Sequence, residues 1–289
     1  MITVGLKGGL ANQMFQIAAL VNVAVQNRVK FGIDPKSWPA ALYGGAHMNP
    51  NQEMIYAVDY QAHPAANYTD TVYRRLPIED LSPESGVQFS GVYQERAYAY
   101  TEIGYFPGMI LEGYFQSEKY FKPSEGVVRK VFAPPPHLKD LFTQTYRHEQ
   151  ETLISVHVRR GAHYHNWKNH GALTADYYRE AMKMFDLGRF LVFSDDIPWC
   201  KKNLKGDHVE FVENKKDYED LYYMSFCDHH IIANSSFGWW GAWLNDNEDK
   251  VVVCPEKWYG PSKNINTKDL IPESWIRIPN QLEGPDGIV

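Results

Sequence analysis

The chain has 289 residues, enough for one large or two medium domains with a sizeable apolar core. Hydrophobic residues make up 44% and charged residues 22%, a composition typical of globular proteins that excludes a disordered chain. The 29 basic and 35 acidic residues give a net charge of −6. This balance argues against a general binding surface for nucleic acid or anionic membranes, so any anion site is a local feature.

The cysteines and the N-terminus indicate an intracellular protein. Cys200, Cys227 and Cys254 are widely spaced and form no C-x-x-C pair, so we expect reduced thiols without a disulfide or metal role. No secretory pattern precedes the first strand, and no apolar run reaches about 18 residues. We therefore expect a cytoplasmic protein without a transmembrane segment.

The first residues have the pattern of a strand, a turn and a helix. Ile2–Leu6 predicts a short strand, and apolar residues at helical spacing predict a helix from Ala11 to about Arg28. Backbone N–H groups at the start of this helix are available to an anion, beside Gly9 in the turn. Asn12 and Gln13 lie in the first helical turn, where they either cap the helix or face a ligand.

The middle of the chain is harder to interpret. Residues 31–34 predict a second short strand, and residues 35–107 have weak periodicity, with a short strand at 87–92 and loops that we expect to face an acceptor. A strand pattern follows at 110–116, and a helix pattern begins at Ser117. Three prolines after Phe132-Ala133 interrupt regular structure, and a helix is predicted at 138–149. We therefore predict domains at 1–132 and 133–289, with the extreme C-terminus able to pack back on the first.

The second half alternates strands and helices. Strands are predicted at 153–158, 190–193, 209–212, 231–233 and 251–254, and helices at 174–185, 218–227 and 237–244. On the helix at 174–185 we expect Tyr177, Tyr178, Ala181 and Met184 to pack inward. The right-handed crossover rule places such strands in one parallel sheet, with their carboxyl ends at one edge. Polar pairs follow three of these strands: Arg159 and Arg160, Asp195 and Asp196, and Ser235 and Ser236.

These polar pairs favour an anion site, because arginine forks and free N–H groups both suit phosphate. A structural arginine–carboxylate pair is the alternative for the arginines, and helix capping is the common role for the aspartates. Residues 162–170 predict a polar, aromatic loop. Its histidines His163, His165 and His170 match no strong zinc pattern, so we expect solvated or substrate-facing histidines rather than a metal site.

Several motifs resemble one enzyme family. Gly8–Gln16 (GGLANQMFQ) resembles the N-terminal signature of the α-1,2-fucosyltransferases of glycosyltransferase family 11. His157–Gly161 (HVRRG) resembles the H-x-R-R motif shared by GDP-fucose-dependent α-1,2-, α-1,6- and protein O-fucosyltransferases. Gly113–Phe121, Phe193–Asp196 and Asn234–Leu244 also resemble family blocks, and all the matches occur in family order between residue 5 and about 260.

The resemblance implies an α/β fold of the GT-B type, with two Rossmann-like domains facing across a cleft. The C-terminal domain would bind the nucleotide and the N-terminal domain chiefly the acceptor. It also implies a metal-independent, inverting transfer of L-fucose from GDP-β-L-fucose to the 2-hydroxyl group of a galactose in a glycan. No cofactor is expected, and the oligomeric state stays open.

The resemblance also assigns roles to individual residues. Arg159 would neutralise the β-phosphate, and Asp220 would recognise guanine. The other residues expected to bind GDP-fucose are His157, Asp195, Ser235, Ser236 and Phe237 from the second domain, and Gly9, Asn12 and Gln13 from the first.

One position departs from the family pattern, because Ala162 stands where an acid usually follows H-x-R-R-G. The general base is therefore unassigned, and His163 or His165 is a candidate because a neutral imidazole can take a proton near neutral pH. A GDP-fucose transferase of another linkage, or a non-catalytic GDP-sugar-binding protein, stays an alternative.

Overall fold

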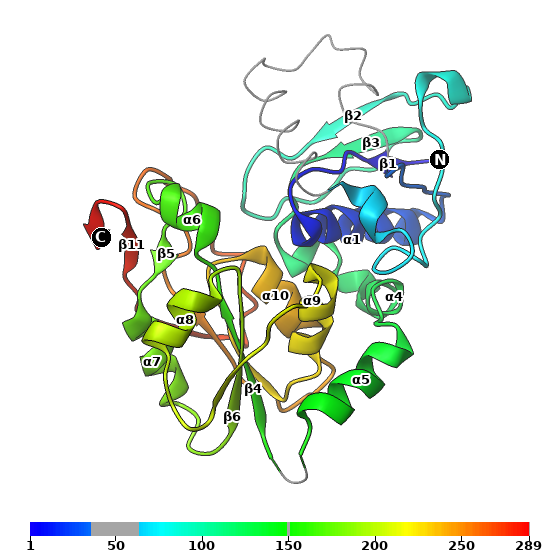
Figure 1. Ribbon diagram of the computed structural model, residues 1–289. Coiled ribbons are helices and arrows are strands. Elements are labelled where there is room, and N and C mark those ends of the chain that lie inside the picture. Colours follow the sequence, from blue (N-terminus) through cyan, green and yellow to red (C-terminus); the bar gives the residue numbers. More distant parts are fainter. Residues whose placement is uncertain (36–63, 149–150, 289) are drawn as a thin grey trace. The chain divides into compact units, whose positions relative to one another are not determined.

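The computed structural model describes residues 1–35, 64–148 and 151–288 (Figure 1). The chain divides into two compact units. The first unit comprises Met1–Ala133 with Asn266–Pro272, and the second comprises Pro134–Ile265 with Glu273–Val289. Residues 36–63, part of the stretch expected to face an acceptor, lie outside the described residues. The predicted roles of the two domains stay predictions.

The first unit is built on a parallel sheet with strand order β1-β3-β2. The bridges Ile2–Phe31 and Ile33–Ile78 continue the pairing beyond β1, so the strand predicted at 31–34 consists only of isolated bridges. β2 overlaps the end of the strand predicted at 87–92 and extends two residues beyond it. The described elements are β1 (Thr3–Val4), α1 (Leu10–Asn27), η1 (Ala65–Tyr68), η2 (Pro83–Ser85), β2 (Gly91–Gln94), β3 (Met109–Glu112), η3 (Glu118–Tyr120), η4 (Lys122–Ser124) and α4 (Glu125–Val131).

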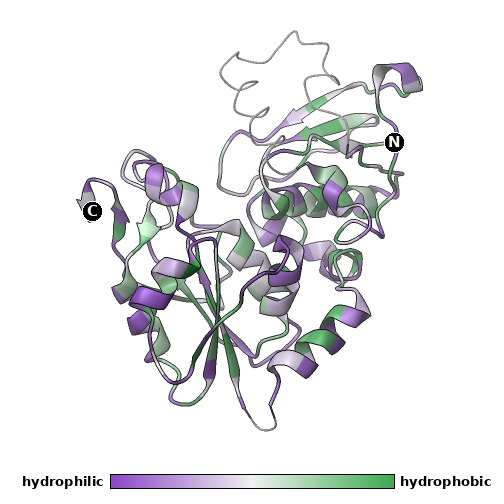
Figure 2. Cartoon of the chain, viewed as in Figure 1, coloured by the Kyte–Doolittle hydropathy of each residue, from purple (hydrophilic) through white to green (hydrophobic). Residues whose placement is uncertain are grey.

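Helix α1 confirms the first strand–turn–helix prediction. Gly8 has φ +73°, a conformation that favours glycine, and Gly9 is the N-cap residue in extended conformation. Met14, Ile17 and Ala18 on this helix are completely buried. Figure 2 shows the apolar character of α1 against the strands of its unit. Burial of this apolar face is the main source of the helix's stability, because propensity alone contributes little.

The second unit contains a six-stranded parallel sheet with order β10-β9-β8-β4-β6-β7. The α/β class with parallel sheets is therefore confirmed. Helices α7 and α8 lie on one side of the sheet, and α9 and α10 lie on the other (Figure 1). The elements are α5 (Pro136–Tyr146), β4 (Leu153–Val158), α6 (Gly161–His165), β5 (Ala172–Leu173), α7 (Ala175–Met182), β6 (Arg189–Ser194), α8 (Ile197–Asn203), β7 (Val209–Phe211), α9 (Asp217–Ser225), β8 (His229–Ile231), α10 (Ser236–Leu244), β9 (Val252–Pro255), β10 (Ile276–Ile278), β11 (Leu282–Gly284) and β12 (Gly287–Ile288).

Three local predictions were wrong. The stretch after the arginines begins with the short helix α6 rather than a loop. Helix α5 starts at Pro136, two residues before the predicted start at 138. A proline is compatible with the first helical position because its missing N–H is not needed there. Met184, predicted to pack inward, lies beyond the end of α7 and is 44% exposed.

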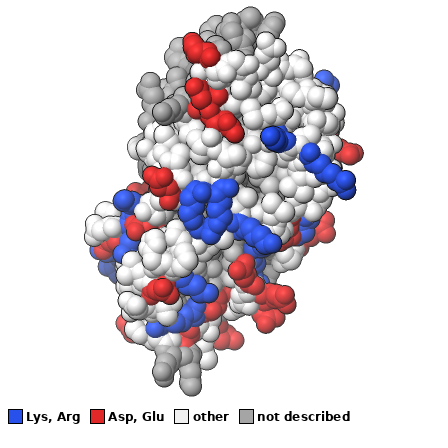
Figure 3. Space-filling view, turned by 90° about the vertical axis from the view of Figure 1, so that its right-hand side faces the viewer, with Lys and Arg blue, Asp and Glu red and all other residues white. Residues whose placement is uncertain are grey.

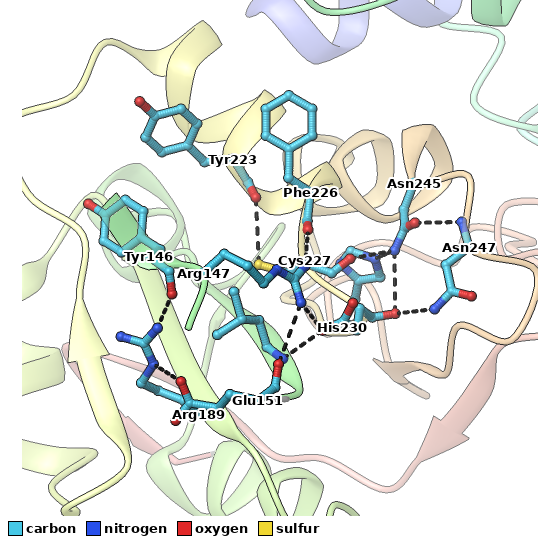
Figure 4. Close-up of polar contacts among 12 residues, drawn as sticks. Tyr146, Arg147, Glu151, Arg189, Tyr223, Phe226, Cys227, His230, Asn245 and Asn247 are labelled. Atoms are coloured by element: carbon cyan, nitrogen blue, oxygen red, sulfur yellow. Dashed lines mark hydrogen bonds and ion pairs between the residues drawn. The ribbon is translucent and has the colours of Figure 1, made fainter. Parts of the chain in front are cut away.

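A polar network lies below the amino ends of β4 and β8 (Figure 4). Asp228 forms an ion pair with Arg147, with 2.7 Å between Oδ2 and Nη1, and accepts the Leu153 N–H. His230 is completely buried and lies 2.7 Å from both Ser155 Oγ and Asn245 Nδ2. These contacts join β4, β8 and the end of α10 at the edge of the sheet opposite the arginines.

Cys200, Cys227 and Cys254 are free and buried, as expected. Burial raises the pKa of the Cys200 thiol to about 11 and that of the Cys254 thiol to about 12, so both are protonated at neutral pH. None of the described helices has the length and apolar character needed to span a bilayer. Figure 3 shows both signs of charge on one face, with uncharged areas between them.

Candidate functional site

The polar pairs of the second unit lie at a reversal in strand order. β4 pairs with β6 on one side and with β8 on the other, and the connections out of β6 and β8 run in opposite directions across the sheet. Ligands of open α/β sheets bind beyond the carboxyl ends of the strands at such a reversal. Arg159 follows β4, and Ser235 lies beyond the end of β8. The fold therefore places both residues at the position where this class of sheet binds its ligand.

Arg159 and Arg160 have different environments although they are adjacent. The Arg159 side chain is 35% exposed and forms an ion pair with Asp195, with 2.9 Å between Nη1 and Oδ2. Arg160 is 5% exposed, and its guanidinium carbon lies 4.0 Å from the centre of the Trp199 ring. It pairs with Glu283 on β11 and lies 3.7 Å from Asp196 Oδ2. Arg159 is thus available to a ligand, whereas Arg160 holds the surrounding structure together.

The two aspartates also divide their roles. Asp195 accepts the Arg160 N–H through Oδ1 at 2.9 Å while it pairs with Arg159 through Oδ2. Asp196 is the N-cap of α8 and accepts the Trp199 N–H at 3.1 Å, which is the capping role considered from the sequence. Asp195 therefore positions Arg159, and its predicted direct contact with GDP-fucose stays a prediction.

His157 packs against the start of α10. Its ring centroid lies 5.6 Å from that of Phe237, and a Cβ atom on Gly238 would lie 2.6 Å from His157 Nδ1. Ser235 is the N-cap of α10 and accepts the Phe237 N–H at 3.3 Å. The predicted residues His157, Ser235, Ser236 and Phe237 thus lie together around one helix N-terminus. N–H groups at such a terminus attract anions.

Asn234 fixes the two loops that flank this helix start. Its Nδ2 donates to the carbonyl oxygens of His170, Gly171 and Trp258 at 3.0–3.1 Å. Beside it, the rings of His163 and His170 stack with centroids 4.8 Å apart, and His170 contacts the Tyr259 ring at 5.8 Å.

Lys263 approaches the same aromatic group, with Nζ 5.0 Å from the centre of the Tyr259 ring. Burial lowers the pKa of Lys263. No ion-pair partner of Lys263 occurs within the part of the chain that the structure describes. A half-buried cation without a carboxylate is costly and suits a site that receives an anion.

The histidines at this edge are held neutral. Burial and the nearby Arg159 lower the pKa of His157 to about 3. Burial, His170 and Arg159 lower the pKa of His163 to about 2, and burial and Lys263 lower that of His170 to about 4. Such a pKa makes the His163 imidazole a weak proton acceptor, and its role as the general base stays a prediction. His165 is exposed on α6.

Asp220 lies in the first turns of α9, which packs against α10. Burial, together with Glu219 and Asp217, raises the pKa of its carboxyl group to about 7. Its Oδ1 atom is buried and has no hydrogen-bond partner among the described residues. A buried carboxylate oxygen without a donor is suited to a ligand that brings N–H groups, as guanine does.

Buried polar atoms without partners are a shared feature of this unit's site. Within the described residues, side-chain atoms of this kind at the site include His157 Nδ1, Arg160 Nε, His163 Nδ1, Asp220 Oδ1 and Asn234 Oδ1. Buried polar groups in native proteins are normally hydrogen-bonded, because an unpaired one costs about 1–3 kcal/mol. The atoms of this kind at the carboxyl ends of the strands could each bond a polar ligand.

The three residues predicted from the first unit lie at the start of α1. Gly9 accepts the N–H groups of Asn12 and Gln13, and Asn12 Oδ1 accepts from Gln116 Nε2 at 2.8 Å. Gln13 is completely buried, and its carboxamide bonds the Gly8 carbonyl and the Tyr73 hydroxyl. These contacts favour a structural role for Gln13. The predicted donor contacts of all three stay predictions.

Sequence reasoning missed several residues of the site. Asn234 belongs to a recognised motif, but its bracing role depends on three carbonyl groups from distant loops. His170 was named only among the histidines expected to be solvated or to face a substrate. Lys263 lies in a polar stretch where nothing in the local pattern distinguishes it from solvated residues. Among the residues that the structure describes, no group of three histidine, cysteine or acidic side chains is arranged to hold a metal ion. The predicted independence from metal stays a prediction.

Comparison with known proteins places the chain in a family. Residues 91–279 match the family described as glycosyl transferase family 11. An alpha-1,2-colitosyltransferase of Escherichia coli is 30% identical over 94% of this chain and 97% of its own length. A galactoside alpha-(1,2)-fucosyltransferase 1 of Leontocebus fuscicollis is 25% identical over 82% of this chain and 63% of its own length. A structure of an Arabidopsis thaliana FUT1 variant in complex with GDP has a TM-score of 0.49 and 14% identity, covering 88% of this chain and 70% of that one. Because the family match covers more than half of the chain and the Escherichia coli relative aligns over nearly its whole length, the chain belongs to glycosyltransferase family 11.

Proposed function

We propose that this glycosyltransferase transfers L-fucose from GDP-β-L-fucose to the 2-hydroxyl group of a galactose in a glycan, with inversion and without a metal ion. The observation that carries the proposal is the half-exposed Arg159 at the reversal of strand order, beside the N-terminus of α10 and the unpaired Asp220 carboxyl group. These groups match the two ends of a guanosine diphosphate. Arg159 and the helix N–H groups suit the diphosphate, and Asp220 suits the guanine.

The chemistry requires these charges because the GDP leaving group gains negative charge as the bond to the sugar C1 breaks. Fixed cations and N–H dipoles stabilise this charge without reorganising during the reaction. Each charge-assisted hydrogen bond contributes about 1.5–3 kcal/mol. Two such bonds from Arg159 that strengthen in the transition state would supply about 3–4 kcal/mol, which corresponds to a factor of about 10² to 10³ in rate.

Colitose is a second candidate for the transferred sugar. The relative that aligns with nearly the whole chain is named a colitosyltransferase. Colitose is L-fucose without its 3-hydroxyl group, so the two donors differ at one hydrogen-bonding position. A site that bonds the 3-hydroxyl group would reject colitose strongly, because its own polar groups would be left unpaired. A site without that contact would accept both sugars.

The test uses the full chain with GDP-β-L-fucose or GDP-colitose and a panel of galactosides, including lactose, with and without EDTA. We expect transfer from GDP-fucose in both buffers and an α-1,2 linkage in the product by NMR. Loss of transfer with EDTA would contradict the metal-free reaction, and another linkage would contradict the acceptor position. Calorimetric titration with GDP separates the remaining cases. GDP binding without transfer would identify a non-catalytic protein, and absence of GDP binding would overturn the proposed donor.

A further inference from the structure

The first unit contains a pocket whose lining residues were not assigned to the candidate site described above. Its volume is about 330 Å³, and it lies beside β2, between this strand and the segment that leads from β2 to β3. β2 is the edge strand of its sheet, so its outer side is not paired with another described strand. The residues that line it include Tyr93, Gln94, Arg96, Thr101, Glu102 and Phe106.

The apolar part of the wall consists of Val92 and the aromatic rings of Tyr93 and Phe106. Tyr93 stacks on Phe115, with ring centroids 6.4 Å apart and an angle of 28° between the planes, which fixes its orientation. Phe106 lies close to Gly91, where an added Cβ atom would be 3.4 Å from its ring. The glycine therefore lets the Phe106 ring lie close to the strand. Fixed aromatic faces of this kind pack against the apolar C–H face of a sugar ring.

Polar groups complete the wall. The side chains of Gln94, Arg96, Thr101 and Glu102 line the pocket. Within the described residues, neither Arg96 nor Glu102 forms an ion pair or side-chain hydrogen bond. Arg96 offers only donors, Glu102 offers acceptors, and Gln94 offers both. Hydroxyl groups of a ligand, which donate and accept, can use all of these groups at once.

Size and charge define the ligand class. A volume of 330 Å³ is at the small end of ligand pockets, which span about 300–1,000 Å³, so it suits a sugar ring better than a nucleotide. The positive Arg96 and the negative Glu102 balance, so the pocket has no excess of cations to attract a phosphate. This distinguishes it from the site of the second unit, where Arg159 and Lys263 lie near a helix N-terminus.

We propose that this pocket binds a neutral hexose ring of the acceptor glycan. The proposal rests on the proposed function in that it takes the ligand to be part of the acceptor. The pocket then selects the acceptor through two aromatic faces and the Arg96–Glu102 pair of opposite charges, while the second unit binds the donor. It predicts that changes in the pocket affect the acceptor and leave GDP binding unchanged.

The test measures glycan binding without the donor. Saturation-transfer and titration NMR would follow binding of lactose, N-acetyllactosamine and methyl β-galactoside to the full chain. We expect Arg96→Ala and Glu102→Gln each to raise the dissociation constant of the bound glycan about tenfold, because each removes a hydrogen bond to a charged group. The dissociation constant of GDP should not change. In turnover, the KM for the acceptor should rise while the KM for the donor stays constant.

Matched controls are Lys30→Ala and Glu84→Gln, which change exposed charges of the same unit away from the pocket. Thermal unfolding would verify that all four variants are folded. Unchanged glycan binding in both pocket variants would overturn the proposal, as would failure of all three glycans to bind the unaltered protein. Glycan binding that depends on Arg96 and Glu102 in a protein without GDP-fucose transfer would instead leave the pocket intact and overturn the proposed function.

Discussion

Arg159 forms an ion pair with Asp195, with 2.9 Å between Nη1 and Oδ2, and the same carboxylate accepts the backbone N–H of Arg160. One acid therefore fixes the side chain of the first arginine and the backbone of the second. A Cβ atom on Gly161 would lie 2.4 Å from Asp195 Oδ2, so the glycine leaves room for this arrangement. The result is a half-exposed guanidinium held at the end of β4 with N–H groups left over for a ligand.

Replacement of Arg159 by alanine should lower kcat by a factor of about 10² to 10³, because the developing charge on the leaving group loses two charge-assisted bonds. The stability of the fold should change little, since pairs this exposed contribute about 0–1 kcal/mol. Steady-state kinetics with GDP-fucose and a galactoside would measure the effect, with Arg179→Ala as a control at an exposed ion pair. Near-normal turnover of the Arg159 variant would contradict the assignment.

Replacement of Arg160 by alanine should act mainly on stability. Its side chain is 6% exposed and pairs with Glu283 while stacking on Trp199, so its loss leaves carboxylates without their cation. Because Glu283 is itself partly exposed, we expect a loss of about 2–3 kcal/mol in unfolding free energy, below the range of fully buried pairs. Chemical denaturation of the Arg159 and Arg160 variants side by side would reveal the difference. Equal stability of the two would disprove this division of roles.

The sequence predicted the strands and polar residues of the site but not the ion pairs and hydrogen bonds among them. The apolar run of β4 and the polar pairs after β4, β6 and β8 follow rules that operate over a few residues, so their common edge was predictable. The partner of Arg160 was not, because Glu283 lies 123 residues away and depends on the pairing of β11 with β5. Strands as short as β5 and β11 have too few residues to show an alternating pattern.

The histidines illustrate a second limit. His163 was a reasonable proton acceptor from its residue type and its place beside the arginines. Its pKa is instead lowered by burial and by the charge of His170, whose ring stacks on it, and both are tertiary features. For Asp220 the shift is in the opposite direction. Its acidic neighbours Glu219 and Asp217 are visible in the sequence, but burial, the largest cause of its raised pKa, is not.

The raised pKa of Asp220 predicts a pH-dependent affinity for GDP. With a pKa of about 7, raised by burial and by Glu219 and Asp217, the carboxyl group is mostly ionised at pH 8 and mostly protonated at pH 6. Only the ionised form accepts both N–H donors of guanine, so its contribution should weaken about tenfold over this interval. Calorimetry with GDP at several pH values would measure this. The affinity of the Asp220→Asn variant for GDP should depend on pH only through the phosphate groups of GDP. A pH profile identical to that of the unaltered protein would refute the guanine contact.

The buried His230 predicts a loss of stability in mild acid. Asn245 Nδ2 donates to one ring nitrogen, so the other nitrogen carries the proton and donates to Ser155 Oγ, and the ring is neutral. Burial, with Lys250 and His229, holds its folded-state pKa well below the usual value. As pH falls below about 6.5, only the unfolded chain takes up this proton, so His230 should contribute about 1.4 kcal/mol per pH unit to the fall in unfolding free energy, or about 2 kcal/mol at pH 5. His157, His163 and His170, whose pKa values are also lowered, add their own contributions to the total slope. Urea unfolding between pH 7 and 5 would measure the slope. His230→Gln should reduce it by that amount, whereas the exposed His208→Gln serves as the control, and equal slopes in both variants would show that His230 does not cause the effect.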